Sequence, residues 1–412
     1  MKRIQNITLL IIFLFLFSRV YIWVSRPMAF SEIFYSYMPY SHLWASGTLP
    51  YLDQWYEYPP ATIPLFYLPH LIDMGTRFKF IHLNYLEAYR GGLLIWDIGL
   101  FSLIWLTLKK VSTPQKILQI SLLFYILMTV KAHDFIYDTM DLTFVTAMTF
   151  GIAVPVFLNS FLGSATSWFG FFLATALKYV NAPLVLIYAV IERKRMKETV
   201  IACFIGFLLV WALPLAFFRS SILVSLVYQN IRGIQIDSVP AIFLRTANVF
   251  TKSEQVIEVF KNYEIAGPLT NQVKNFVKIF FPLSVLCFLI GSSLYIIKNK
   301  KLDNHWSRVH FTLGYVLLFF LTGKVLSTPF LLWLIPLTAI YPFRKTNDQL
   351  AVLIPSAVAI SISMTNVPNW SIFIFPFPLI VGWIRTFCFL FLFMFWLKLS
   401  KQEINLIRKQ PK

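Results

Sequence analysis

The 412-residue sequence is 58% hydrophobic and 13% charged, which excludes a water-soluble globular protein of this size. Its formal net charge of +18 raises the question of nucleic-acid binding, but the basic residues lie in short loops between apolar runs. That distribution is typical of membrane topology, and we expect no nucleic-acid partner. Cys203, Cys287 and Cys388 lie inside apolar stretches without CxxC spacing, so we expect neither a disulfide framework nor a zinc site.

Apolar runs long enough to cross a bilayer recur along the chain. Lys2 and Arg3 precede the first run, and because no small-residue cleavage site follows it, we interpret it as a retained helix. The predicted fold class is all-α, a polytopic transmembrane helical protein of about 12 spans in a single domain over 1–412. The predicted spans are 7–24, 88–108, 114–130, 141–158, 162–178, 180–191, 198–218, 276–297, 309–322, 329–343, 350–364 and 375–398.

Clusters of Lys and Arg mark every second boundary between these spans. Because cytoplasmic loops carry the excess of basic residues, we expect these clusters and both termini on the cytoplasmic side of the plasma (inner) membrane. Two long loops, 25–87 and 219–275, then lie on the non-cytoplasmic side. The clusters are Lys109 and Lys110, Arg193 to Lys197, Lys298 to Lys301, Arg344 and Lys345, and Lys398 onward.

Two segments do not fit regular spans. The pair 162–178 and 180–191 is too short for two full crossings at a rise of about 1.5 Å per residue, so we expect a broken, partly re-entrant hairpin. Residues 59–72 contain four prolines, and we expect an interfacial segment that holds no regular helix. It belongs to the first outer loop, in which we expect short interfacial helices.

Charged residues gather on the predicted outer side, at or between helix ends. Near lipid, such groups cost free energy unless they are paired or hydrated, so the gathering indicates a functional cavity. The residues are Glu32, Asp53, Glu57, Asp134, Asp138, Asp141, Lys178, Arg232, Asp237 and Lys324.

Motifs in the same loops are similar to a known enzyme family. Gly47 to Asp53 forms a G-x-x-P-Y-x-D stretch and Glu57 to Pro60 reads E-Y-P-P. They resemble the C-type superfamily of integral-membrane glycosyltransferases, most closely its bacterial polyprenyl-phosphate-mannose-dependent mannosyltransferase-like branch, family 87. Further stretches agree with that branch in order and in loop placement, namely Leu177 to Tyr179, Arg232 to Ser238 and Lys324 to Leu334.

The sequence also departs from the family pattern at three places. Glu32 stands where the family usually has Asp, and the proline expected three residues after Lys178 comes later, at Pro183. Phe330 occupies a position where the family more often has Gln.

The resemblance implies transfer of a hexose, mannose in this branch, from a polyprenyl-phosphate donor to a glycolipid or envelope-glycan acceptor, with inversion. Such transfer needs a carboxylate to take the acceptor proton and cations to hold the departing phosphate. The chain shows neither GxGxxG nor a P-loop, which agrees with a lipid-linked donor. The alternative is a polytopic transporter or a lipid or glycolipid flippase. Such a protein is expected to show inverted repeats and broken helices near the membrane midplane.

The acids divide into a base and groups that bind the acceptor. Glu32, just beyond the first span, is the candidate base, and its alternative is a solvated loop acid. Asp53 and Glu57 are predicted to bind acceptor hydroxyls or a divalent cation, the one cofactor the residues suggest, with loop-fixing hydrogen bonds as the alternative. Asp134, Asp138 and Asp141 would share a helical face, with helix capping as the alternative, and Asp141 matches a family acid.

The bases are candidates for the donor phosphate. Arg232 is the first choice, because a guanidinium binds phosphate bidentately and Gly233 lets the backbone approach a ligand. Lys324 and Lys178 are predicted as further phosphate ligands, and all three have a lipid-snorkelling alternative. His42 and His133 show no metal spacing, and we interpret them as structural or interfacial.

Overall fold

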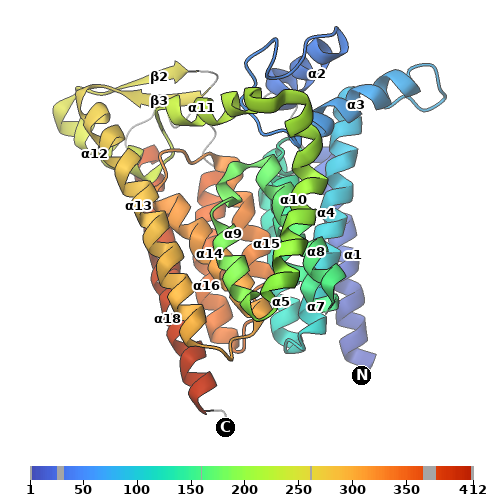
Figure 1. The fold of residues 1–412 in the computed structure, drawn as a ribbon, viewed down its shortest axis with the longest axis vertical. Helices are drawn as coiled ribbons and strands as arrows, with labels where there is room; N and C mark the ends of the chain where they lie inside the picture. Colours follow the sequence, from blue (N-terminus) through green and yellow to red (C-terminus); the bar gives the residue numbers. More distant parts are fainter. Residues whose placement is uncertain (1, 26–31, 159, 260–261, 365–376, 410–412) are drawn as a thin grey trace. The chain divides into compact units, whose positions relative to one another are not determined.

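The computed structural model describes residues 2–25, 32–158, 160–259, 262–364 and 377–409. The chain is dominated by helices (Figure 1). Its internal contacts divide it into two compact units. Unit 1 comprises Met1–Ala182 and Arg195–Ile231, and unit 2 comprises Pro183–Lys194 and Arg232–Lys412.

Five helical stretches among the described residues are long and apolar enough to cross a membrane. They confirm the membrane-protein class predicted from composition, while the count of about 12 spans stays a prediction. The stretches are Tyr85–Lys110, Arg193–Ile231, Pro268–Lys298, Thr346–Met364 and Pro378–Arg408.

The regular secondary-structure elements in the described part of unit 1 are helices. α8 packs between α7 and α10, and α4 packs against α3, α5 and α7. Its helices are α1 (Lys2–Ser25), the π-helix η1 (Ile33–Tyr37), α2 (Met38–Ala45), α3 (Thr62–Thr76), α4 (Tyr85–Lys110), α5 (Gln115–Lys131), α6 (His133–Ile136), α7 (Asp141–Phe157), α8 (Phe161–Leu177), the 3-10 helix η2 (Tyr179–Asn181), α10 (Met196–Phe218), η4 (Arg219–Ile222) and α11 (Leu223–Ile231).

Close packing of α8 depends on small residues at its two interfaces. A Cβ atom on Gly170 would lie 2.9 Å from the backbone nitrogen of Gly151 in α7. A Cβ atom on Gly206 of α10 would lie 2.8 Å from the backbone of Trp168 in α8. Membrane helices use such residues because they bring two backbones into van der Waals contact.

Unit 2 combines helices with a small antiparallel sheet of order β1-β3-β2. Ile265 of β3 lies opposite Ile234 of β1 and Val256 of β2, and Ala241 and Leu244 of α12 pack with Ile234 and Ile265. The elements are α9 (Leu184–Ile191), β1 (Ile234–Gln235), α12 (Val239–Thr251), β2 (Gln255–Val259), β3 (Asn262–Ala266), α13 (Pro268–Lys298), α14 (Asn304–Thr322), the 3-10 helix η5 (Thr328–Trp333), α15 (Leu334–Ala339), α16 (Thr346–Met364) and α18 (Phe377–Lys409), with η3 (Arg193–Arg195) at the boundary between the units.

This sheet is the first difference from the all-α prediction. Its strands lie inside the predicted outer loop 219–275, and β2 is largely exposed, so its residues form no apolar run that a hydropathy pattern detects. Within the same loop α12 is capped by Ser238, whose side chain accepts from the backbone of Ala241.

Two further element predictions need correction. Residues 59–72 were predicted to hold no regular helix, but α3 begins at Thr62. Pro64 falls in the first turn, where no intrahelical N–H bond is lost, so only Pro69 interrupts the ladder. The predicted span 329–343 consists instead of η5 followed by the six-residue α15.

The predicted break between 162–178 and 180–191 is confirmed. α8 ends at Leu177, Lys178 is extended, and a 3-10 turn precedes the eight-residue α9. The last predicted span began at residue 375, and residues 375 and 376 lie outside the described ranges.

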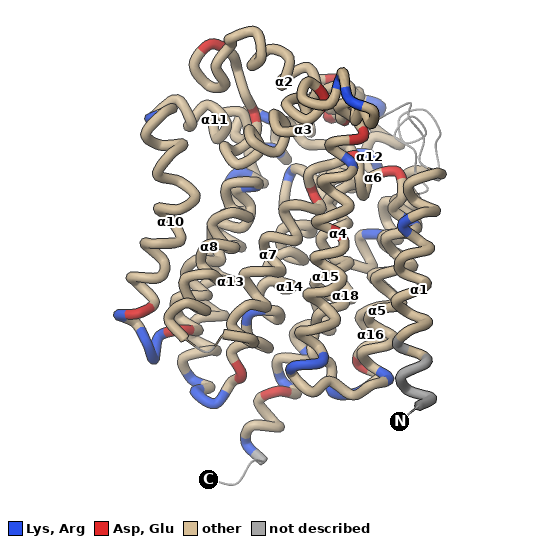
Figure 2. Tube along the Cα trace, turned by 90° about the vertical axis from the view of Figure 1, so that its right-hand side faces the viewer, with Lys and Arg blue, Asp and Glu red and all other residues tan. Residues whose placement is uncertain are grey.

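Orientation in the membrane leads to a labelling prediction for unit 1. Thr48 follows α2. Lys197 lies in the first turn of α10, at the end of that helix far from α2, where Figure 2 shows Lys and Arg in blue. We expect Thr48→Cys, in a background lacking the three natural cysteines, to react with a membrane-impermeant thiol reagent in intact cells, and Lys197→Cys to react only after lysis. Labelling in the reverse pattern would contradict the predicted topology.

Candidate functional site

Interlocked aromatic rings organise the predicted outer loop of unit 1. Tyr37 stacks on Phe66 of α3 at a centroid distance of 4.0 Å, and Tyr40 meets Tyr56 edge to face at 5.0 Å. Tyr56 in turn lies 5.7 Å from the ring of Tyr58. Because packed aromatic rings bury much apolar surface, these contacts stabilise the loop that carries Glu57.

Glu32 is exposed at the edge of this aromatic cluster. It immediately precedes the π-helix η1, a rare geometry that is frequent at functional sites. Burial raises the pKa of Tyr37 and of Tyr58 well above the ordinary value, and the negative charge of Glu32 raises both further. Glu32 is therefore a solvent-accessible carboxylate beside phenols that stay protonated.

Glu57 is held by a neighbouring phenol. The Tyr40 hydroxyl donates a short hydrogen bond to Oε2 of Glu57. Burial, and after it the charge of Glu57, raises the pKa of Tyr40, so the phenol keeps its proton and remains the donor. The charge of Glu57 also acts on Tyr58, so the carboxylates of Glu32 and Glu57 both lie near one phenol.

Asp53 stabilises its own turn. Its Oδ2 accepts from the backbone N–H of Leu49 at 2.8 Å, while its own N–H donates to the Leu49 carbonyl at 3.0 Å. This is the loop-fixing arrangement considered as its alternative role. Asp53 nevertheless stays exposed and lines a shallow depression of about 240 Å³ with Trp55 and Val224.

Two of the predicted ligands pair with each other. Nζ of Lys178 lies 2.6 Å from Oδ1 of Asp141, and both side chains are largely buried. The pair joins the break after α8 to the first turn of α7. In this structure the positive charge of Lys178 is therefore balanced by a carboxylate inside unit 1.

The prediction that three aspartates share a helical face is wrong. Asp134 lies in the one-turn helix α6, Asp138 in the following turn and Asp141 at the start of α7. Asp138 forms a bidentate ion pair with the buried Arg90, at 2.6 and 2.7 Å. The chain leaves the helix between α6 and α7, so helical spacing does not apply there.

The acids of unit 1 nevertheless converge. The backbone N–H of Ala61 donates to the carbonyl of Ala176 at 3.0 Å, which joins the predicted outer loop to the end of α8. Besides Glu32, the charge of Asp141 also acts on the Tyr37 phenol. Unit 1 thus brings Glu32, Glu57 and the Asp141–Lys178 pair to one region, at the α2 and α3 end of its helices.

Unit 2 gathers four bases, which we call the basic cluster: Arg232, Lys274, Lys278 and Lys324. Nζ of Lys324 donates to the carbonyl of Arg232 at 2.7 Å. Burial and, after it, the charges of Lys274, Lys278 and Arg232 lower the pKa of Lys324 to about 8, against the opposing effect of Glu264. The cluster therefore concentrates positive charge, which suits an anionic ligand.

Gly233 has a structural role that differs from the predicted one. Its N–H donates to Oε2 of Glu264 at 2.9 Å, and a Cβ atom at this position would lie 2.2 Å from that oxygen. The close approach is therefore made by Glu264 of β3 rather than left open for a ligand. This contact and the bond from Gln235 N–H to the Lys324 carbonyl, 2.9 Å, fix the backbone beside Arg232.

Sequence reasoning missed several of these residues. Lys274 and Lys278 stand four apart on the first turns of α13, which begins at Pro268 rather than at the predicted residue 276. Their spacing around the start of the predicted span was the available signal, since residues four apart share a helical face. Tyr40, Arg90 and Glu264 gave no such signal because their roles depend on distant partners.

Metal binding has no assembled site in the described ranges. No group of three or more His, Cys, Asp or Glu side chains there is arranged to hold a metal ion. His42 packs edge to face on His70 at 5.3 Å, and His133 lies 3.1 Å from Asp134.

Comparison of the sequence with family models and with curated proteins finds no match. Among solved structures, the crystal structure of ArnT from Cupriavidus metallidurans in the apo state aligns with 93% of this chain and 76% of that chain. The identity is 13% and the TM-score 0.37.

Proposed function

We propose that this protein is a membrane glycosyltransferase that moves a hexose from a polyprenyl-phosphate donor to a glycolipid or envelope-glycan acceptor. We propose mannose as the hexose and the non-cytoplasmic face of the plasma membrane as the place of transfer. The observation that carries the proposal is the basic cluster of unit 2. The positive charge of these four bases, beside which Glu264 lies, matches the negative charge of a lipid-linked phosphate. The loop motifs that resemble C-type glycosyltransferases support the same reaction.

The basic cluster is proposed to hold the donor phosphate. The Arg232 guanidinium offers a planar fork that matches two phosphate oxygens, whereas Lys324 acts as a point charge. Lys274 and Lys278 of α13 add to the positive potential at the cluster. Lys178, a predicted phosphate ligand, serves in this proposal to hold Asp141 through their ion pair.

Glu32 is proposed as the general base. The acceptor oxygen attacks the anomeric carbon, the bond from that carbon to the phosphate oxygen breaks, and Glu32 takes the hydroxyl proton. The phosphate leaves as polyprenyl phosphate with the electron pair, so no second carboxylate is needed to protonate it. Glu57, oriented by Tyr40, and Asp53, beside the exposed Trp55, are proposed to bind acceptor hydroxyls.

A transfer assay tests this function. Purified protein in nanodiscs would receive polyprenyl-phosphate [¹⁴C]mannose and envelope glycolipids, and labelled glycolipid is the expected product. Arg232→Ala should lower transfer by about 10- to 100-fold, because a charged hydrogen bond to phosphate is lost. Arg232→Lys should restore part of it, since the charge returns without the fork.

Arg195→Ala provides the matched control, because Arg195 is exposed at the start of α10 and pairs only loosely with Glu198 at 3.8 Å. It should transfer at the wild-type rate. Absence of transfer from any polyprenyl-phosphate hexose, together with protein-dependent movement of the lipid between leaflets, would establish the flippase alternative instead.

Donor binding should depend on pH through Lys324. With a pKa of about 8, against an ordinary 10.5, this ammonium loses its proton at a lower pH than other lysines. We expect affinity for a polyprenyl-phosphate analogue to fall as the pH rises through about 8, because the lysine then loses its charge. Near that pH, binding should be accompanied by proton uptake, because the bound anion favours the charged form of Lys324.

Calorimetry in buffers of different ionisation enthalpy measures this uptake directly. Lys324→Arg should abolish the dependence, because a guanidinium stays protonated throughout. Wild-type affinity that is constant between about pH 7 and 9.5 would remove Lys324 from the phosphate site.

A further inference from the structure

The loop that joins α3 to α4, Arg77–Leu83, presents large apolar side chains to its surroundings. Phe78 is 97% exposed, Phe80 105% and Ile81 67%. Water-soluble surfaces seldom place three such side chains together, and a concentration of this kind marks an interaction site. We call Phe78, Phe80 and Ile81 the apolar tip.

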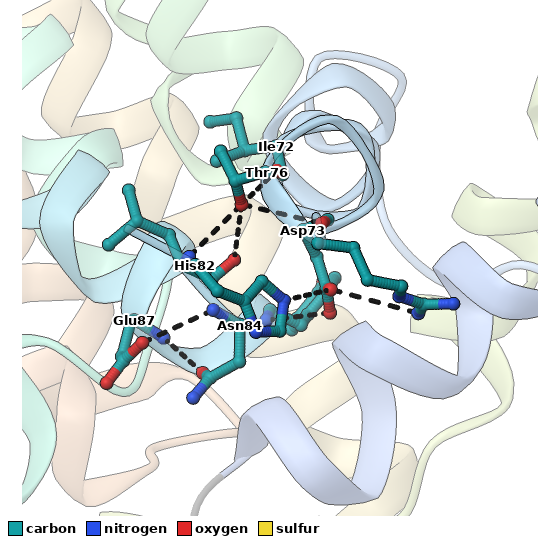
Figure 3. Close-up of polar contacts among 9 residues, drawn as sticks. Ile72, Asp73, Thr76, His82, Asn84 and Glu87 are labelled. Atoms are coloured by element: carbon teal, nitrogen blue, oxygen red, sulfur yellow. Dashed lines mark hydrogen bonds and ion pairs between the residues drawn. The ribbon is translucent and has the colours of Figure 1, made fainter. Parts of the chain in front are cut away.

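Hydrogen bonds close the base of the loop (Figure 3). The Thr76 hydroxyl donates to the Ile72 carbonyl at 2.8 Å and accepts from the Leu83 N–H at 3.1 Å. Asp73 lies 3.0 Å from Nε2 of His82 and accepts from the Tyr85 N–H at 3.1 Å. These bonds determine the path of the loop, so the exposure of the apolar tip is a feature of the fold.

The start of α4 adds to this base. Asn84 and Glu87 form a capping box, in which each side chain accepts from the other residue's backbone N–H (Figure 3). The apolar tip is therefore connected to the first turn of a helix that is long and apolar enough to cross the membrane, Tyr85–Lys110.

α3 continues the apolar surface. Phe66 and Pro69 face inward and are buried, whereas Leu68, Leu71 and Met74 are about half exposed. In Figure 1, α3 extends sideways from the top of α4, and the loop forms its far end. The exposed stripe of α3 and the apolar tip thus lie beside the end of a candidate membrane span.

Charge identifies the occupant of this surface. Lys79 stands between Phe78 and Phe80, and Arg77 precedes them, with 59% of its side chain exposed. In a protein interface the charge of Lys79 would be buried among apolar groups, where charged residues are depleted. At a bilayer surface the same alternation lets the aromatic rings enter the acyl boundary while the cations remain at the phosphates.

We propose that Arg77–Leu83 and the exposed stripe of α3 anchor unit 1 to the surface of the bilayer. Phe78, Phe80 and Ile81 insert at the boundary of headgroups and acyl chains, and Arg77 and Lys79 bind the phosphates of anionic phospholipids. This inference concerns lipid contact alone and does not depend on the proposed sugar transfer.

Depth-dependent fluorescence quenching tests the anchor. A polarity-sensitive dye would be attached at Phe80→Cys, in full-length protein lacking the three natural cysteines, in phosphatidylcholine nanodiscs with or without phosphatidylglycerol. We expect blue-shifted emission and stronger quenching by a nitroxide at acyl carbon 5 than at carbon 12, because such segments insert by about 5–10 Å. Phosphatidylglycerol should strengthen the quenching.

Two variants provide the controls. Ser46→Cys, exposed after α2, should carry a dye that aqueous iodide quenches and lipid nitroxides do not. Arg77→Gln with Lys79→Gln, in the Phe80→Cys background, should remove the effect of phosphatidylglycerol while leaving the elution volume unchanged, since Arg77 meets the base only through a loose ion pair with Asp73 at 3.9 Å.

Two results would overturn the proposal. One is a Phe80 dye as open to iodide as the dye at Ser46 in both lipid mixtures. The other is a dye protected from iodide and from both nitroxides, which would show that a second protein copy covers the loop.

Discussion

Glu32→Gln is expected to lower the rate of sugar transfer by about 10²- to 10⁴-fold, the usual contribution of a general base. The amide keeps the shape of the side chain but accepts no proton from the acceptor hydroxyl. The phosphate is held by other residues in this proposal, so donor affinity should persist. A single-turnover assay with lipid-linked sugar separates the chemical step from binding.

Conservative variants make this test specific. Glu32→Asp should retain part of the activity, because the carboxylate is present but one methylene shorter. Glu57→Gln and its partner variant Tyr40→Phe should weaken acceptor affinity more than the chemical step, since both disturb the same hydrogen bond. Wild-type transfer by Glu32→Gln, with an inactive Glu57→Gln or Asp53→Asn, would locate the base in the proline-rich loop instead.

Asp97→Ala is expected to destabilise the folded protein by about 3–5 kcal/mol, the usual effect of breaking a buried ion pair. Asp97 lies in the middle of α4 with no exposed surface, and its two oxygens accept from Arg19 at 2.7 and 3.0 Å. The hydroxyls of Tyr125 and Tyr137 donate to the same carboxylate at 2.5 and 2.6 Å. Removal of the carboxylate would take away the one charge that neutralises the buried Arg19 guanidinium in this pair, together with an acceptor that two phenols share.

Unfolding in mixed micelles at increasing dodecyl sulfate concentration measures the loss. Arg19→Leu with Asp97→Leu should recover much of it, because no charge then remains buried without its partner. Glu198→Ala is the matched control: it removes an exposed partner from the Arg195 pair, for which about 0–1 kcal/mol is expected. Equal stability of Asp97→Ala and Glu198→Ala would show that the Arg19–Asp97 pair contributes little.

The sequence by itself determined the position of several long apolar helices. The predicted span 141–158 is α7 almost residue for residue, 88–108 lies within α4, and the break at Lys178 is where α8 ends. These features are local, because a membrane requires a run of apolar residues and a backbone that satisfies its own hydrogen bonds. The helix α3 was missed because four prolines were counted without regard to their positions: Pro59 and Pro60 precede the helix, and Pro64 lies in its first turn.

The tertiary structure alone decided what each charged residue does. Asp141 and Lys178 are separate candidates in the sequence, and only the packing of α7 on α8 makes them an ion pair. Lys274 shares a helical face with Lys278 only because α13 begins at Pro268, before the predicted span, and the charges of both act on Lys324. The physical reason is that hydropathy is a property of neighbouring residues, whereas the free energy of a charge depends on which distant groups fold against it.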